Sequence, residues 1–394
     1  ETVAFSRRGH ERRAVSVAWS ADGRHILSGS KDGTVYIWKA TPGNEAMTLV
    51  EPTNFLGGLS WTSDGKRVLT AGGTWLELGA LDGYVREWDV ESGREVRSFE
   101  PVQDAFYQVS LSPDGRYFLT RQDPAVDGFD AIIVWDYHTG HVVNIIKTID
   151  RIDGFFTRNA EWAPDSQRIA EVTSNGQAKV FDAVTGQELV SFTGHPVGSF
   201  LIGVAWSPDG RWVATTGGTG EPFARVWNSV TGQERLLLAH DDAVNSVMWS
   251  PAGDRICTSS GDVESGGVDN AIRLWDAQTG ELQRIIRGHL AGVWRCGWSP
   301  NGQRIFSVSQ DGTTRVFDSE TGAELLQLST PTYWFLDAFW SPTGEYLATV
   351  GDAQPARVWR VWQSTQELID YARNCCVIRD LTAKEREQYG LSKP

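Results

Sequence analysis

Short runs of alternating apolar and polar residues, separated by turns rich in Asp and Gly, recur along almost the whole chain. The first such unit spans 9–43, with an apolar alternation at 15–19, a turn at 20–23, and further apolar runs at 26–30 and 35–38. A period of two is the pattern of a half-buried strand, and Asp-Gly pairs favour tight turns. The unit therefore predicts three short antiparallel strands.

An aromatic residue at the end of the first predicted strand marks nearly every copy of this unit. The positions recur at intervals of 42 to 51 residues, close to the period of a four-stranded propeller blade. These anchor positions are Trp19, Trp61, Leu111, Trp162, Trp206, Trp249, Trp298 and Trp340. A second aromatic position ends the third strand, at Trp38, Trp88, Trp135, Phe181, Trp227, Trp275, Phe317 and Trp359.

The repeated unit resembles the WD repeat, on the strength of the Gly-His pair at 9–10, the Asp-Gly turns and Trp-Asp pairs such as that at 88–89. The resemblance covers nearly the whole chain. It implies an all-β fold, an eight-bladed WD-repeat β-propeller over residues 1–363. Trp and Gly at fixed places in each copy are the cues of such radial repeats.

The two ends of the chain differ from the repeated unit. Residues 2–6 alternate like a strand, and the eighth copy has no fourth strand after Trp359, so we expect residues 2–6 to complete the last blade and close the ring. Ser364 and Glu367 are spaced as a capping box. Residues 364–394 are therefore predicted to form a short helical tail packed on the propeller.

The balance of charges limits the partners that the chain can bind. Fifty acidic against 36 basic residues give a net charge of −14, which disfavours nucleic acid and anionic membranes. No apolar run approaches the roughly 18 residues of a transmembrane helix, and the N-terminus has no signal-peptide pattern. We therefore predict no nucleic-acid partner and no membrane partner.

The cysteines favour a reducing compartment. Cys257 and Cys296 fall in predicted strands, where a small buried residue is the ordinary interpretation, and Cys375 and Cys376 are adjacent. The four show neither zinc-ligand spacing nor a framework of pairs. A cytoplasmic location fits best.

Four residues of the first copy match the positions that form a buried hydrogen-bonded network in WD repeats: His10, Ser28, Asp32 and Trp38. We interpret them as structural and not as a nucleophilic triad. Later copies keep parts of the set. Blade seven offers His289, Ser307 and Asp311 with Phe317; blade five has His195 and Trp227 without an obvious Asp; blade six has His240 and Trp275 with Asp269 as a candidate partner.

The search for catalytic motifs is negative. The sequence has no Gly-x-Ser-x-Gly elbow, no phosphate-binding glycine-rich loop with Lys, and no His-Glu-x-x-His. We therefore predict a protein that is not an enzyme, with no catalytic residues, no cofactor and no metal site.

Insertions add length to one face of the ring. They fall mainly between second and third strands, at 73–81, 122–130 and 261–270, and in the segment 150–158 that leads into blade four. By the resemblance these loops share the top face, and loops on a rigid scaffold are common binding positions. Several large aromatic residues and one Arg fall at the same rim, a composition typical of protein-binding hot spots, although some of the aromatics could be ordinary core. The predicted partner-binding residues are Tyr107, Phe156, Arg158, Phe200, Trp294, Trp334, Trp75 and Phe129.

These features predict a non-catalytic platform that binds a protein or peptide on its top face. The tail, with Leu368, Ala372, Arg373, Leu381, Thr382 and Glu385, resembles tails that follow the last propeller of multidomain prokaryotic proteins. That resemblance implies the partner-sensing portion of a larger signalling or defence protein, coupled to an effector domain in the same chain such as an NTPase, a caspase-like peptidase or a kinase. A start at Glu1 without Met fits this arrangement. A constitutive assembly scaffold is the alternative, and a propeller hydrolase is a third and less favoured one.

Overall fold

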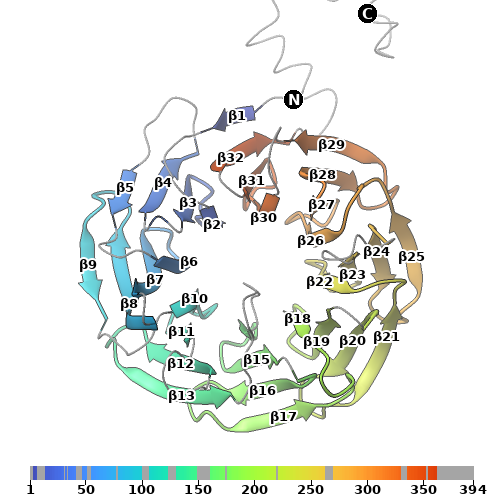
Figure 1. The fold of residues 1–394 in the computed structure, drawn as a ribbon, viewed down its shortest axis with the longest axis horizontal. Helices are drawn as coiled ribbons and strands as arrows, with labels where there is room; N and C mark the ends of the chain where they lie inside the picture. Colours follow the sequence, from blue (N-terminus) through green and yellow to red (C-terminus); the bar gives the residue numbers. More distant parts are fainter. Residues whose placement is uncertain are drawn as a thin grey trace, which may run out of the picture.

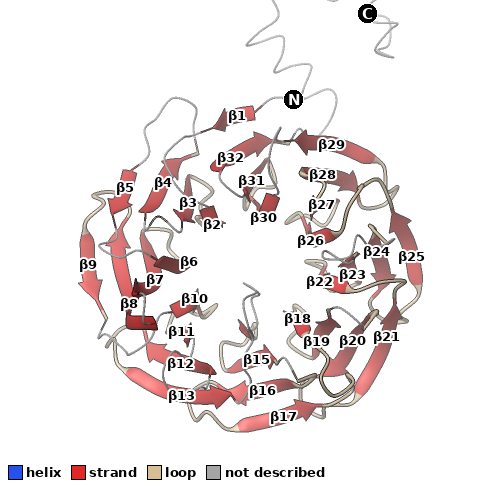
Figure 2. Ribbon diagram, viewed as in Figure 1, coloured by secondary structure: helices blue, strands red, loops and turns tan. Residues whose placement is uncertain are grey.

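The computed structural model describes residues 3–6, 14–30, 32, 34–40, 47–50, 55–76, 79–99, 106–122, 130–148, 160–173, 175–218, 221–261, 269–329, 335–351 and 354–361. In this part of the chain the strands form eight four-stranded antiparallel sheets, and no helix occurs. The sheets stand side by side around a ring (Figure 1 and Figure 2). The predicted all-β fold of an eight-bladed propeller is confirmed.

Each blade is one of these sheets, and the chain builds the blades in order. Blade one contains β2 (Ala14–Trp19), β3 (His25–Ser30), β4 (Thr34–Lys39) and β5 (Met47–Val50), and blade two contains β6 (Phe55–Trp61), β7 (Arg67–Leu76), β8 (Gly79–Asp89) and β9 (Glu95–Ser98). Blade three contains β10 (Phe106–Leu111), β11 (Tyr117–Gln122), β12 (Asp130–Asp136) and β13 (Val142–Thr148), and blade four contains β14 (Ala160–Trp162), β15 (Arg168–Val172), β16 (Ala178–Asp182) and β17 (Glu188–Phe192). Blade five contains β18 (Leu201–Trp206), β19 (Trp212–Gly217), β20 (Phe223–Asn228) and β21 (Glu234–Ala239), and blade six contains β22 (Val244–Trp249), β23 (Arg255–Ser260), β24 (Ile272–Asp276) and β25 (Leu282–Ile286). Blade seven contains β26 (Val293–Trp298), β27 (Arg304–Ser309), β28 (Thr313–Asp318) and β29 (Glu324–Ser329), and blade eight contains β30 (Phe335–Trp340), β31 (Tyr346–Gly351), β32 (Gln354–Arg360) and β1 (Val3–Ser6).

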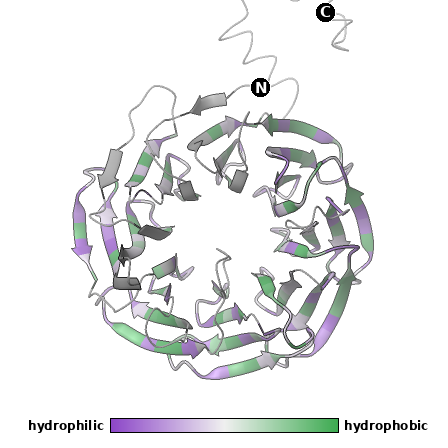
Figure 3. Cartoon of the chain, viewed as in Figure 1, coloured by the Kyte–Doolittle hydropathy of each residue, from purple (hydrophilic) through white to green (hydrophobic). Residues whose placement is uncertain are grey.

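The position of a strand within its blade determines how much of it is buried. First strands lie at the inside of the ring and fourth strands at its circumference (Figure 1). Second strands such as β27 are buried along their length, whereas the outer strand β21 alternates between exposed and buried residues. Figure 3 shows the matching alternation of polar and apolar residues along the outer strands. This is the period-two pattern from which the strands were predicted.

The apolar core of the described residues is divided into clusters, each shared by two neighbouring blades. Leu27 of blade one and Leu59 of blade two belong to one cluster, and Val17 of blade one and Ala348 of blade eight belong to another. A second strand thus packs against the first strand of the next blade all the way round. Burial of apolar surface is the main favourable contribution to folding, so each blade depends on both of its neighbours.

The anchor tryptophan at the end of the first strand also links adjacent blades. Nε1 of Trp61 donates a hydrogen bond to the carbonyl oxygen of Ala18 in the preceding blade at 3.2 Å. Nε1 of Trp19 makes the corresponding bond to the carbonyl of Phe339 in blade eight at 3.1 Å, which joins the ends of the ring. The same link is made by Trp162, Trp206 and Trp298. In these five copies the neighbouring strand supplies the acceptor that the indole N–H needs.

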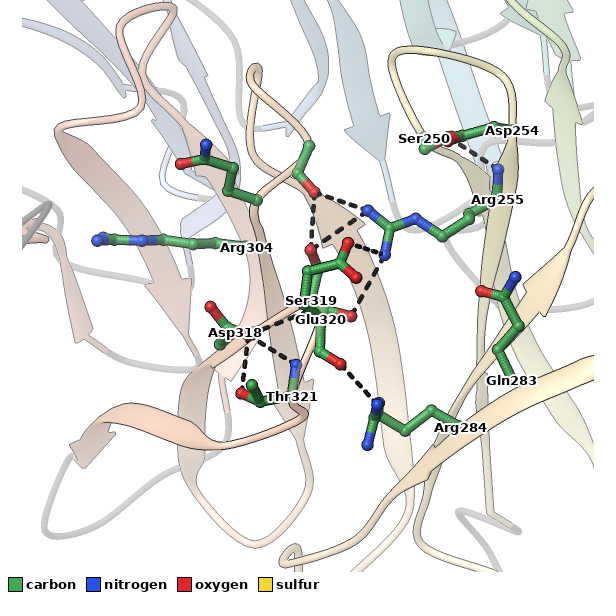
Figure 4. Close-up of polar contacts among 12 residues, drawn as sticks. Ser250, Asp254, Arg255, Gln283, Arg284, Arg304, Asp318, Ser319, Glu320 and Thr321 are labelled. Atoms are coloured by element: carbon green, nitrogen blue, oxygen red, sulfur yellow. Dashed lines mark hydrogen bonds and ion pairs between the residues drawn. The ribbon is translucent and has the colours of Figure 1, made fainter.

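Arginine at the start of a second strand forms a further link. The guanidinium of Arg255 in blade six lies 4.9 Å from the ring centroid of Trp298 in blade seven, and its Nη1 lies 2.8 Å from a carboxylate oxygen of Glu320 (Figure 4). Arg168 lies at the same distance, 4.9 Å, from the ring of Trp206. A planar guanidinium can stack on an indole and donate hydrogen bonds at the same time.

Strand β1 joins the two ends of the ring. It pairs antiparallel with β32, with Val3 opposite Trp359 and Ser6 opposite Arg357, and it is the fourth strand of blade eight. The predicted closure of the ring by the N-terminal strand is confirmed for Val3–Ser6.

Removing residues 1–8 should lower the melting temperature by several degrees. The deletion removes β1 and leaves the outer edge of β32 without its hydrogen-bonding strand. Thermal unfolding followed by circular dichroism measures the change. A truncated chain that melts at the same temperature as the intact one would contradict the role of β1 in closing the ring.

One predicted loop is an extension of two strands. The spacing predicts a loop over 73–81, but β7 and β8 remain paired as far as Leu76 opposite Gly79. The register shifts between Thr74 and Trp75, which marks a bulge. Trp75 therefore lies on a long hairpin of blade two. The predicted helical tail at 364–394 lies outside the described residues.

Candidate binding face

Strand directions assign the connecting segments to two faces of the ring. Because neighbouring strands in a blade are antiparallel, segments that lead into first strands emerge on the same face as those joining second and third strands. We call this the top face. The bottom face carries the short turns that follow the first and third strands. Blades five to seven provide the best-described part of the top face, with the segments 193–200, 240–243 and 287–292.

In blade five a buried histidine fixes the first of these segments. Nδ1 of His195 lies 2.8 Å from Oε1 of Glu221, and Nε2 lies 2.8 Å from Oγ1 of Thr215. An ionised carboxylate can only accept, so Nδ1 donates to Glu221 and Nε2 accepts the hydroxyl of Thr215. Burial alone would raise the pKa of Glu221, but the hydrogen bond from His195 keeps that pKa below its usual value. Val197, two residues after this fixed point, is 97% exposed.

Blade seven repeats the arrangement with an aspartate. Nδ1 of His289 lies 2.9 Å from Oδ2 of Asp311, and Nε2 lies 2.7 Å from Oγ of Ser307. The backbone N–H of Leu290 donates to Oδ2 of Asp311 at 2.9 Å. The main chain of Leu290 is therefore tied to the blade, while its side chain is 86% exposed.

Blade six uses a neutral histidine without an acid. Nδ1 of His240 lies 3.0 Å from the carbonyl oxygen of Leu238, which can only accept, so Nδ1 carries the proton. Nε2 then accepts from Oγ1 of Thr258 at 2.7 Å, and this hydroxyl accepts in turn from Nε1 of Trp275 at 2.9 Å. Every polar atom of this chain of hydrogen bonds has a partner when the imidazole is uncharged.

Asp269 is not the partner of His240, and that prediction is wrong. Its Oδ2 accepts hydrogen bonds from Nη1 of Arg273 and from Oγ of Ser260. Nη2 of Arg273 also reaches Oδ2 of Asp241 at 2.7 Å, and the Asp241 side chain is 70% exposed. The longer loop of blade six thus places a buried ion pair, with an exposed acid beside it, on the top face.

The predicted network of blade one is described in part. Nε1 of Trp38 donates to Oγ of Ser28 at 2.9 Å, and Oδ1 of Asp32 accepts from the backbone N–H of Thr34 at 2.8 Å. His10 lies outside the described residues. The same bond from a third-strand indole to a second-strand hydroxyl recurs in the pairs Trp88–Thr70, Trp135–Thr120, Trp227–Thr215, Trp275–Thr258 and Trp359–Thr349.

Phe200 and Trp294 are the predicted partner-binding residues whose side chains are described. Phe200 precedes β18, Trp294 lies on β26, and both are half-buried. Nε1 of Trp294 is buried and has no hydrogen-bond partner among the described residues. Trp75 and Tyr107 lie on β7 and β10. The remaining four, Phe129, Phe156, Arg158 and Trp334, lie outside the described residues.

The residues that sequence reasoning missed are the two most exposed apolar side chains of the described surface, Val197 and Leu290. Both follow the histidine of a blade, by two residues and by one residue, and that spacing is the signal that could have identified them. Neither residue is aromatic, whereas the predicted binding rim was identified by its aromatic residues. Val197 and Leu290 lie on the same face, in blades five and seven, with the charged group of Asp241 and Arg273 in the blade between.

In the part of the chain that the structure describes, no cluster of His, Cys, Asp and Glu could hold a metal ion. A hollow of about 750 Å³ lies on the bottom face between the turns of blades six and seven, and Arg255 on its wall is paired with Glu320 (Figure 4). None of the described segments is a helix long and apolar enough to cross a membrane.

Four segments of the chain match the family model described as "WD domain, G-beta repeat": 2–39, 186–228, 232–276 and 280–318. Each match joins the outer strand of one blade to the first three strands of the next, and the first match includes β1. These four segments are therefore similar to WD repeats, as the sequence predicts for them.

Two relatives among those that the chain matches are eukaryotic proteins of low identity. The chain is 23% identical over 326 residues to eukaryotic translation initiation factor 3 subunit I of Botryotinia fuckeliana (strain B05.10), covering 80% of this chain and 93% of that protein. It is 23% identical over 337 residues to anaphase-promoting complex subunit cdh1 of Dictyostelium discoideum, covering 77% of this chain and 41% of that protein.

Solved structures share the fold. The C-terminal WD40 domain of Sif2 matches with a TM-score of 0.71 at 16% identity, over 89% of this chain and 96% of that domain. The computationally designed Ika8 protein matches with a TM-score of 0.69 at 22% identity, over 92% of this chain and all of the design, 100%. At these identities the two matches show a shared fold and nothing about function.

Proposed function

We propose that this chain, a β-propeller built of WD repeats, is a non-catalytic protein-recognition platform whose top face binds a protein or peptide. The repeat family and the names of the relatives support the general class, because two of those relatives are named as subunits of larger assemblies. The observation that carries the choice of face is the pair Val197 and Leu290, which are almost fully exposed on segments held by the buried hydrogen bonds of His195 and His289.

The geometry suits recognition with little loss of entropy. The main chain beside each exposed side chain is fixed by a histidine and its acid, so binding orders few additional groups. An apolar contact at each end with a charged pair between them fits a partner that has two apolar side chains and a basic or polar residue between them. Half-buried Phe200 and Trp294 lie on the same side and would add aromatic contact.

The narrower prediction, a sensor within a larger prokaryotic signalling or defence protein, draws no support from the eukaryotic relatives described above. It stays a prediction, as does a cytoplasmic location. A constitutive scaffold uses the same face in the same way. The two differ in whether binding of the partner changes an effector domain elsewhere in the chain.

Paired surface variants test the proposed face. Val197→Asp combined with Leu290→Asp should reduce capture of a protein partner by about tenfold or more, because a carboxylate at a desolvated contact loses both apolar burial and charge compatibility. The matched control is Val184→Asp combined with Val230→Asp, two exposed valines in bottom-face turns of blades four and five. Quantitative pull-down from cells of the source organism, with circular dichroism to verify folding, compares the variants. Loss of the same partner in the control alone would refute the top-face assignment.

A further inference from the structure

Two of the four cysteines meet between blades six and seven. Cys257 lies on β23 and Cys296 on β26, and both side chains are fully buried. Their Sγ atoms are 2.7 Å apart. A disulfide needs about 2.05 Å between the sulfurs, so a combined shift of about 0.7 Å would bring these two to bonding distance.

The pair occupies the recurring place where one blade packs against the next. Cys257 stands on a second strand, two residues after Arg255, and Cys296 stands on a first strand, two residues before the anchor Trp298. The corresponding pair between blades four and five is Ala170 with Val204, which belong to one apolar cluster. At the same place, the other interfaces between neighbouring blades hold apolar pairs. These are Leu27–Leu59, Leu69–Val109, Leu119–Ala160, Ala214–Val247, Phe306–Ala338 and Ala348–Val17. Two thiols stand here in place of two inert side chains.

The surroundings hold the two sulfurs in this arrangement. The backbone N–H of Cys296 donates to Oγ of Ser246 at 3.1 Å, and Ser246 belongs to β22 of blade six. This bond fixes the main chain of one cysteine to the blade that carries the other. The main chains that carry the two thiols are therefore kept side by side.

We propose that Cys257 and Cys296 are a reversible oxidation site whose disulfide fastens blade six to blade seven. With a hydroperoxide as oxidant, one thiolate attacks a peroxide oxygen of hydrogen peroxide, forming a sulfenic acid and releasing hydroxide. The second sulfur attacks the sulfenic sulfur and expels hydroxide, so the disulfide forms. The two thiol protons convert both hydroxides to water. Overall the thiols lose two electrons and two protons, and one peroxide becomes two waters.

Burial makes this a slow reaction in the closed ring. It raises the pKa of the Cys257 thiol well above its usual value, and the thiolate is the form that attacks. Oxidation therefore depends on local opening of the interface between the two blades. Once formed, the bond closes a long loop between 257 and 296 and restricts the unfolded chain, so the oxidised protein is the more stable form.

Peroxide treatment of the purified, reduced chain tests the proposal. The chain is incubated with hydrogen peroxide in buffer and in urea just below its unfolding transition, and free thiols are then alkylated after denaturation. Mass spectrometry of non-reduced peptides should find Cys257 joined to Cys296, with the pair lighter by two hydrogen atoms. The oxidised chain should melt several degrees higher, and dithiothreitol should reverse the shift.

Variants separate this pair from the other thiols. Cys375→Ala combined with Cys376→Ala should keep both the cross-link and the shift. Cys257→Ala and Cys296→Val should lose both, and each puts in a residue that the same place holds in another blade, Ala170 or Val204, so folding should be retained. Full alkylation of Cys257 and Cys296 under both conditions would overturn the proposal. So would a cross-link that leaves the melting temperature unchanged.

Discussion

Replacing Asp311 by alanine should lower the free energy of unfolding by about 2–4 kcal/mol, one of the largest effects of any single substitution outside the apolar core. The carboxylate accepts from the imidazole of His289 and from the backbone N–H of Leu290, and its side chain is only 5% exposed. Alanine would remove the acceptor of the Leu290 N–H and leave the buried imidazole of His289 with only the hydroxyl of Thr313, 3.1 Å from Nδ1. The hydrogen bonds from His289 and Thr313 outweigh burial and hold the pKa of Asp311 well below its usual range, so the carboxylate is charged at neutral pH.

Urea-induced unfolding measures this loss, and a second aspartate provides the control. Asp276 also accepts a backbone N–H, from Thr279 at 2.7 Å, but in a solvent-facing turn. Asp276→Ala should therefore lower the free energy of unfolding by less than about 1 kcal/mol, because water can replace the lost acceptor. If both variants lost the same free energy of unfolding, the buried network of His289 and Asp311 would contribute no more than an exposed turn, against the prediction.

The second large effect is a loss of stability in mild acid that originates at His240. Burial, and then the positive charge of Arg273, lower the pKa of His240 to about 4 from its ordinary value of 6.5, against smaller opposing effects of the Leu238 carbonyl and of Asp269. As pH falls, the unfolded chain binds a proton at this site near pH 6.5, and the folded chain does so only near pH 4. Its contribution to stability is complete above pH 6.5 and is lost progressively between 6.5 and 4, by about 3 kcal/mol.

Two measurements check the His240 prediction. Imidazole titration by NMR should show one histidine that stays neutral at pH 5, and His240→Gln should remove that resonance. Urea unfolding should show that the difference in stability between the wild type and this variant narrows as pH falls from 7.5 to 4.5. A His240 resonance that titrates near pH 6.5 would contradict the buried neutral state.

The repeated architecture was predictable because local patterns carry it. Alternating residues, Asp-Gly turns and the recurring Trp are sufficient to place strands, turns and the order of the blades. The anchor Trp is needed in most copies because its indole bonds to the preceding blade, as Trp61 does to Ala18. Blade three has Leu111 at this place, and its backbone N–H instead donates to Oγ of Ser60 at 3.1 Å. The link between blades is kept by a different group.

The details of the buried networks were less predictable, because they depend on side-chain reach across a loop. A search for Asp missed Glu221, whose longer side chain reaches His195 from the other end of the loop. Gly217 makes room for it, since a Cβ there would lie 2.4 Å from Oε2 of Glu221. In blade six the candidate acid, Asp269, pairs with Arg273 and not with His240. Sequence spacing does not decide between two such partners.

The exposure of the proposed binding residues could not be predicted from the sequence pattern either. Val197 and Leu290 look like ordinary apolar residues in the sequence, and their near-complete exposure follows from histidines that hold the main chain and leave the side chains outside. The meeting of Cys257 with Cys296 likewise depends on how neighbouring blades are set against each other, which no single repeat specifies.

Site-specific photo-cross-linking can show whether a protein partner contacts the top face. A photoreactive phenylalanine analogue is placed singly at Val197, Leu290 and, as the bottom-face control, Val230, and each protein is irradiated with the captured partner. If the partner binds the top face, it should be cross-linked from positions 197 and 290 and not from 230. A cross-link from position 230, with none from the other two, would contradict it.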